Sequence, residues 1–68
     1  MRNELKPKSL LSDRDVAARL GVGRTYVWRL VREEGLTRVK FGRRTLFPSD
    51  EIDQLIERRI ADARREAA

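Results

Sequence analysis

The sequence predicts a mainly α-helical fold that carries one small β-hairpin. Two short amphipathic segments, at residues 12–20 and 24–34, follow each other with only a glycine-containing turn between them. A stretch of alternating residues interrupted by a glycine comes next, at 36–47, and a last helical pattern begins near residue 49. A chain of 68 residues is too short to build two cores, so these elements must share one.

The first helix is expected to follow Ser12 and to end near Leu20. Ser12 stands three residues before Asp15, and this is the spacing of a capping box. Val16, Ala17 and Leu20 then fall on one face of the helix at the spacing i, i+1 and i+4. The segment is therefore short and apolar on one side only.

The second helix is expected from Arg24 to about Glu34. Gly21 can adopt the left-handed conformation that closes the first helix, and Gly35 ends the second. The apolar stripe of the second helix consists of Val27, Leu30 and Val31. The opposite face carries Thr25, Arg29 and Arg32, while Tyr26 and Trp28 flank the stripe.

A β-hairpin is expected after the second helix. Residues 36–41 alternate in the period of a half-buried strand, with Arg38 and Lys40 on the outer side. Residues 42–44 give a turn signal, and residues 45–47 form a second strand that stops at a proline. The residues of this half of the chain that we assign to the core are Phe41, Phe47 and Ile52.

A third helix is expected to begin with a cap at Ser49 or Asp50, followed by an acidic first turn. Its buried face is predicted to consist of Ile52, Leu55, Ile56 and Ile60. Residues 61–68 favour a charged helical tail with little to bury, which should fray unless a partner binds it. Residues 1–9 lack an apolar period and are expected to form a flexible arm, so the domain is predicted at 10–60.

The positive charge is concentrated in the middle of the chain. The whole chain carries +5, whereas residues 19–44 contain eight basic and two acidic residues, a net charge of +6. Clustered arginines gain free energy by displacing counterions from phosphates, so this segment suits a polyanion. A solvated charged surface explains the charge equally well. The fold must distinguish a surface that binds a polyanion from one that is only solvated.

The composition argues against several classes of protein. Without cysteine or histidine the chain lacks thiolate metal ligands and the commonest general base, so we expect no metal, no cofactor and no enzymatic activity. Carboxylates such as Asp50 and Asp53 are typical of a helix start. Apolar runs of two or three residues predict no contact with a membrane and no secretory signal, which favours a cytoplasmic protein.

Two short helices joined by a tight glycine turn, with arginines on the outer face of the second, are typical of a helix-turn-helix. Ala17 is small where the second helix must approach the first. The residues expected to fill the angle between the helices are Val16, Leu20, Val22, Val27 and Leu30. Because a hairpin follows as a wing, the predicted fold is a winged helix-turn-helix.

A series of short motifs extends this pattern over residues 10–57. They are Leu10-Leu11-Ser12, Val16-Ala17, Leu20-Gly21-Val22, Arg24 with Val27-Trp28-Arg29-Leu30-Val31, and Val39-Lys40-Phe41-Gly42-Arg43-Arg44 with Pro48. Together they resemble the phage-type excisionase family (Xis, recombination directionality factors), whose domain is related to that of MerR-type regulators. Gly23 departs from the Ser or Thr usual there, which weakens the helix cap, and Trp28 replaces a Tyr or another aromatic residue.

The resemblance implies that the second helix enters the major groove of DNA and that the wing lies along the adjacent minor groove. The helix residues expected to contact DNA are Arg24, Thr25, Tyr26, Arg29 and Arg32. The wing residues expected to contact DNA are Arg38, Lys40, Arg43 and Arg44. For Trp28 we favour packing against the wing over a contact with DNA.

The basic residues of the third helix are interleaved with acidic ones, which favours ion pairs along an exposed helix over a contact with a neighbouring protein. The residues in question are Arg58, Arg59, Arg64 and Arg65, with Glu57, Asp62 and Glu66 between them.

The resemblance further implies an excisionase that bends attachment-site DNA and promotes excision of a phage or mobile element in a bacterial host. Its expected partners are double-stranded DNA, an integrase of the tyrosine recombinase type, and further copies of itself on adjacent sites. A small phage or prophage transcriptional regulator with the same fold is the alternative. A module whose basic face binds an acidic protein is a third hypothesis, and an enzyme is a remote fourth.

Overall fold

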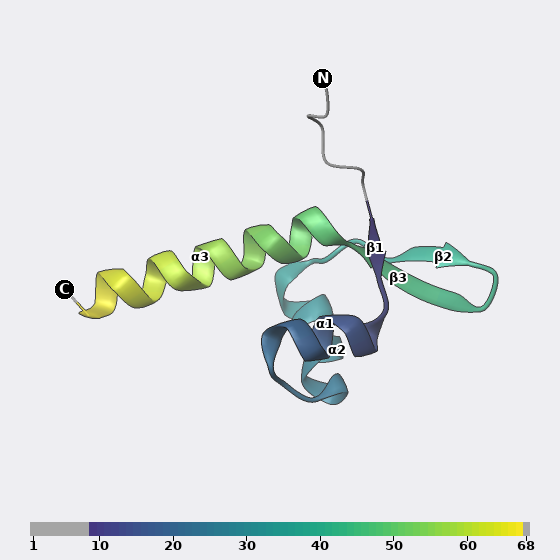
Figure 1. Cartoon of the computed structure of the whole chain (residues 1–68), viewed down its shortest axis with the longest axis horizontal. Helices are drawn as coiled ribbons and strands as arrows, with labels where there is room; N and C mark the ends of the chain where they lie inside the picture. The colour runs from purple at the N-terminus through teal and green to yellow at the C-terminus, as the bar shows by residue number, and fades with distance from the viewer. Residues whose placement is uncertain (1–8, 68) are drawn as a thin grey trace, which may run out of the picture.

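The structure of the protein is a computed structural model that describes residues 9–67. Its elements are β1 (Leu10–Leu11), α1 (Asp13–Leu20), α2 (Arg24–Glu34), β2 (Val39–Phe41), β3 (Arg44–Pro48) and α3 (Ser49–Ala67). Figure 1 shows α1 and α2 packed together below the sheet, with the β2–β3 wing projecting to one side and α3 to the other. The prediction of a mainly helical winged helix-turn-helix is confirmed.

The helix-turn-helix forms as its local signals predict. The hydroxyl of Ser12 accepts from the backbone N–H of Asp15 at 3.0 Å, and a carboxylate oxygen of Asp15 accepts from the backbone N–H of Ser12 at 3.2 Å. This reciprocal pair is the expected capping box of α1. Gly21, at φ 70°, closes α1 in the left-handed region. The chain therefore turns within three residues and enters α2 at Arg24.

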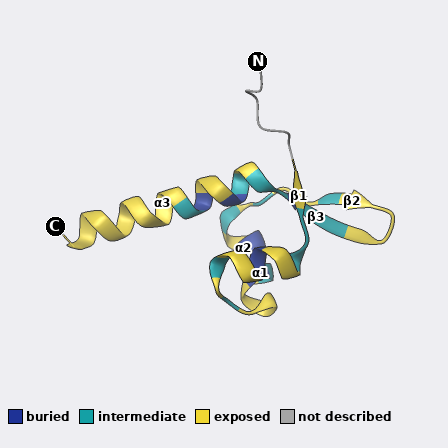
Figure 2. Ribbon diagram, viewed as in Figure 1, coloured by how far each residue is buried: buried dark blue, intermediate teal, exposed yellow. Residues whose placement is uncertain are grey.

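A small apolar core joins the helices to the root of the wing (Figure 2). Its buried members are Val16, Ala17, Val27, Leu30, Val31, Phe47, Ile52 and Leu55. Phe47 of β3 meets the ring of Trp28 of α2 edge to face, with 5.4 Å between the ring centroids. This contact fixes the wing relative to α2, as predicted for Trp28.

The sheet has three antiparallel strands in the order β1-β3-β2, one more than the expected hairpin. Leu10 pairs with Pro48 and Leu11 with Phe47, and the backbone N–H of Ser49 donates to the carbonyl of Ser9 at 2.9 Å. A strand of two residues is too short to show a period, so the sequence gives no signal for it. Most of the predicted arm, residues 1–8, lies outside the described residues.

The strand β2 is shorter than the predicted strand at 36–41. The carboxylate of Glu51, in the first turn of α3, accepts from the backbone N–H of Thr37 at 2.8 Å and from its hydroxyl at 2.7 Å. The backbone N–H of Thr37 is therefore satisfied without pairing to a neighbouring strand. The same bonds favour the charged form of Glu51 and lower its pKa. Leu36 packs on the core instead of entering the strand.

The assignment of Phe41 to the core is wrong, because its side chain is 59% exposed. The turn contains two residues, Gly42 and Arg43, so Phe41 pairs with Arg44 and not with a residue further along β3. A register that differs by one residue moves a side chain to the other face of a sheet. Phe41 therefore lies on the face opposite Phe47, at the tip of the wing.

The assignment of Ile60 to the buried face of α3 is also wrong, because this residue is 38% exposed. Leu55 is the last buried residue of the helix and Ile56 is half-buried, whereas all residues from 57 to 67 are exposed. The helix nonetheless continues to Ala67, so its last turns extend beyond the core. Among residues 9–67, no helix has the length and apolar character needed to span a bilayer.

Candidate nucleic-acid interface

The outer face of α2 is formed by residues that lie opposite its buried stripe. Thr25, Arg29 and Arg32 are all exposed, and with Gly23, Tyr26 and Trp28 they line a shallow open depression. The major groove of duplex DNA is wide enough to admit an α-helix. The face predicted to contact DNA is therefore exposed and continuous.

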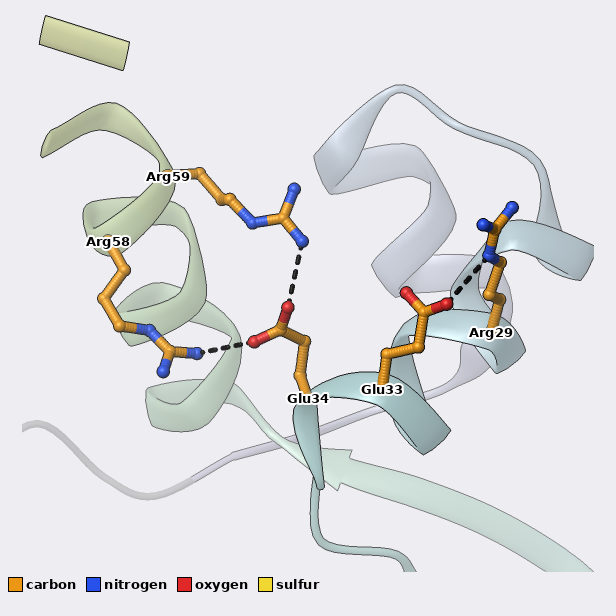
Figure 3. A network of polar contacts seen from close by, with 5 residues as sticks. All are labelled: Arg29, Glu33, Glu34, Arg58 and Arg59. Carbon is orange, nitrogen blue, oxygen red and sulfur yellow. Dashed lines mark hydrogen bonds and ion pairs between the residues drawn. The ribbon is translucent and has the colours of Figure 1, made fainter. Parts of the chain in front are cut away.

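Arg29 lies near the middle of this face. Its Nε donates to a carboxylate oxygen of Glu33, one helical turn later, at 3.0 Å, as Figure 3 shows. The bond and the charge of Glu33 raise the pKa of Arg29. The guanidinium also lies 5.9 Å from the ring centroid of Tyr26. Because the ion pair with Glu33 is exposed to solvent, a phosphate or a guanine can compete for the guanidinium.

Arg24 lies at the side of α2 that faces α1. A carboxylate oxygen of Asp13 accepts from the Nε1 of Trp28 at 3.0 Å and from the Nε of Arg24 at 3.4 Å. The indole hydrogen bond, together with the charge of Arg24, lowers the pKa of Asp13. Sequence reasoning missed this role of Asp13, since the residue carried only the signal of an acidic first turn.

The N-terminus of α2 is left without a side-chain cap. Gly23 is its N-cap residue and makes no capping hydrogen bond, and the first turn contains no acidic residue. The sequence predicted this weak cap from the glycine. Backbone N–H groups at such a helix end can donate hydrogen bonds to a phosphate. The N-terminus of α2 can therefore bind an anion although it lacks a side-chain cap.

The wing carries its cations around a tight turn. Gly42 has φ 60° and Arg43 a negative φ, the φ pattern of a type II′ turn, whose twist matches that of a hairpin. On one face, the Nζ of Lys40 donates to the hydroxyl of Thr45 at 3.2 Å. Arg43 and Arg44 are exposed at the tip. The wing thus presents three cationic side chains within the five residues 40–44.

Trp28 connects the two parts of this surface. It borders the depression on the outer face of α2 and also a second one, between α1 and the wing. The second depression is lined by Ser12, Asp13, Trp28, Arg43, Arg44 and Thr45. The helix face and the wing arginines therefore belong to one surface of the molecule.

All nine residues predicted to contact DNA are exposed, although they are not all brought together. Arg38 precedes β2 at the root of the wing and lines neither depression. Between residues 9 and 67, ion pairs engage Arg24 and Arg29 but not Arg32, Arg43 or Arg44.

Two of the four basic residues of α3 form ion pairs with α2 and not along the helix as predicted. Arg58 and Arg59 both donate to the carboxylate of Glu34, at 3.2 and 3.0 Å, and so join α3 to the end of α2 (Figure 3). Only Arg65 pairs within α3, with Asp62. The prediction of pairing within the helix is wrong for Arg58 and Arg59, because Glu34 comes within their reach only in the folded chain.

An exposed cationic helix and a cationic wing on one surface define a winged helix-turn-helix protein of the DNA-binding class. A family model described as a helix-turn-helix domain matches residues 10–60, and the chain belongs to this family. The family is a DNA-binding domain found in excisionase-like small proteins. Neither the curated proteins nor the solved structures include a significant match to the chain.

Proposed function

We propose that this protein is an excisionase, which binds and bends attachment-site DNA and directs an integrase toward excision of a phage or mobile element. The observation that carries the proposal is the continuous surface that joins the outer face of α2 to the wing arginines through Trp28. The occurrence of this family in excisionase-like small proteins favours excision over other uses of the same surface.

In the proposed complex, α2 enters the major groove with Thr25, Arg29 and Arg32 toward the bases and their phosphates. The wing follows the adjacent minor groove, where a narrow A·T-rich segment attracts Arg43 and Arg44. Contacts in both grooves can offset the cost of bending the DNA, on the order of 1–6 kcal/mol for a site of a few tens of base pairs.

Binding on adjacent sites completes the proposal. A single domain of this size contacts few phosphates, so neighbouring copies on repeated sites raise the affinity through a high effective concentration. The end of α3 extends beyond the core and offers an exposed charged helix to the integrase. The protein performs no catalytic step and acts in the cytoplasm of a bacterial host.

The test is an excision assay between two attachment sites with a cognate integrase of the tyrosine recombinase type, with and without this protein. We expect excision to rise when the protein is added and integration to fall. The double variant Arg29→Ala and Arg43→Ala should lose this effect. Arg19→Ala is the matched control, because Arg19 pairs with Asp53 of α3 at 2.8 Å and lines neither depression of the interface. Unchanged direction of recombination would contradict the proposal and leave the transcriptional regulator as the better hypothesis.

A further inference from the structure

Phe41 is the most exposed large apolar side chain among residues 9–67. It is 59% exposed, compared with 37–39% for Leu10, Tyr26 and Ile60. It ends β2 directly before the turn at Gly42 and Arg43, so it lies at the tip of the wing. Burial in the core cannot account for an aromatic residue at this position.

The hairpin places three cationic residues within three positions of Phe41 in the sequence. Phe41 pairs with Arg44, and paired residues share one face of the ribbon. Lys40 and Thr45 form the other face, where their side chains are hydrogen-bonded. Arg43 occupies the turn between the two strands. The tip therefore carries one exposed aromatic ring and three cationic side chains, of which Arg44 shares the face of the ring.

The apolar surface is confined to the tip and does not spread over the sheet. Val39 and Leu46 lie on the same face as Phe41, but both are half-buried. A broad protein interface has an apolar centre from which charged residues are depleted. The tip of the wing has the opposite composition, with a single projecting ring beside cationic side chains. The positive charge of the tip complements a polyanion.

We propose that Phe41 is a wedge that enters the minor groove of duplex DNA beside Arg43 and Arg44. The minor groove is about 6 Å wide, so the tip of a two-stranded ribbon meets both of its walls. Arg43 and Lys40 contact the phosphates, while the ring packs on deoxyribose and partly unstacks a base step. Inserted apolar side chains bend DNA in this way. The inference rests on the proposed DNA binding and adds the residue that deforms the duplex.

An apolar wedge and a cation leave different signatures in a salt titration. A ring that leaves water displaces no counterions, whereas each phosphate contact contributes about −0.9 to the slope of log K against log salt. Phe41→Ala should therefore weaken binding about 10- to 100-fold, as expected for a buried aromatic side chain, at every salt concentration. Arg43→Ala should instead make the slope shallower by about 0.9.

The experiment measures fluorescence anisotropy with a labelled duplex that contains an A·T-rich tract, and bending of the same duplex by energy transfer between end labels. The variants are Phe41→Ala, Phe41→Leu and Arg43→Ala. The matched control is Ile60→Ala, which truncates an exposed apolar side chain of α3. Circular dichroism verifies that each variant is folded, as expected for the exposed Phe41.

We expect Phe41→Ala to lose affinity with an unchanged salt slope and to bend the saturated duplex less, with Phe41→Leu intermediate. The wedge is refuted if Phe41→Ala binds and bends like Ile60→Ala while the wild type binds well. It is equally refuted if Phe41→Ala lowers only the cooperativity between adjacent sites, because the ring would then contact a second copy. Weak binding by the wild type with a flat salt dependence would contradict the proposed function itself.

Discussion

The hydrogen bond between Trp28 and Asp13 links α2 to α1 beside the wing, and Trp28→Phe removes it. The indole Nε1 donates to Asp13 at 3.0 Å, and the Asp13 side chain is only 21% exposed. Phenylalanine keeps an aromatic ring against Phe47 but leaves the carboxylate without this donor. A hydrogen bond to a charged group contributes about 1.5–3 kcal/mol, and we expect a loss of about 2 kcal/mol. A domain of this size has a total stability of roughly 3–10 kcal/mol, so the loss is large.

The same variant should change the response of the protein to acid. The indole bond lowers the pKa of Asp13 from its ordinary 3.8, so the folded state favours the ionised carboxylate. This contribution to stability is present above the unfolded pKa and is lost as the pH falls through the lower folded pKa. The difference in the free energy of unfolding between wild type and Trp28→Phe should therefore be largest at neutral pH and shrink below about pH 4.

The assay is urea denaturation followed by circular dichroism at neutral and acidic pH. The set contains the wild type, Trp28→Phe, Asp13→Asn and the double variant, which form a double-mutant cycle. The cycle corrects for the favourable position of Asp13 in the first turn of α1. We expect a coupling energy of at least about 1 kcal/mol at neutral pH. Additive losses, or a Trp28→Phe effect that does not depend on pH, would refute this role of the indole.

Three further variants test the wing, the core and α3. Gly42→Ala forces a side chain into φ 60°, so the hairpin should lose about 1 kcal/mol and DNA affinity should fall, measured by thermal denaturation and anisotropy. Gly42→Asn is the matched control and should lose less, because Asn tolerates the left-handed region better than Ala. Phe47→Ala should cost about 3–5 kcal/mol and unfold most of the protein, which urea denaturation would detect, whereas Phe47→Leu should stay folded. Glu34→Gln should speed amide hydrogen exchange in α3 and leave DNA affinity unchanged, because it releases only Arg58 and Arg59; unchanged exchange would contradict the link to α2.

The elements that the sequence predicts well are those with local signals. The capping box at Ser12 and the left-handed Gly21 depend on residues within one turn of the chain, and both are found as predicted. The bounds of α2 follow in the same way from its apolar stripe and the glycine after Glu34. Because these signals also set the outer face of α2, the exposure of Arg29 could be predicted, although its pairing with Glu33 was not.

The features that the sequence misses depend on contacts between distant residues. The alternation around Phe41 fits a strand, but the face on which its side chain lies depends on whether the turn holds two residues or three. A change of one residue in the turn moves the side chain to the opposite face of the sheet. The strand at Leu10–Leu11 exists only because β3 offers it an edge. The bond of Asp13 to Trp28 and the pairs of Glu34 with α3 likewise form only when the helices are packed.

The most direct test of the account is selection of duplex DNA by the full chain from a random library, followed by a salt titration of the selected duplex. We predict one enriched sequence, with log K falling steeply as log salt rises. Arg29→Ala and Arg43→Ala should each reduce that slope by about 0.9, and Arg29→Ala should also relax the preference at the base pairs read in the major groove. No enriched sequence, together with a flat salt dependence, would contradict the conclusion that α2 and the wing form a DNA-binding surface.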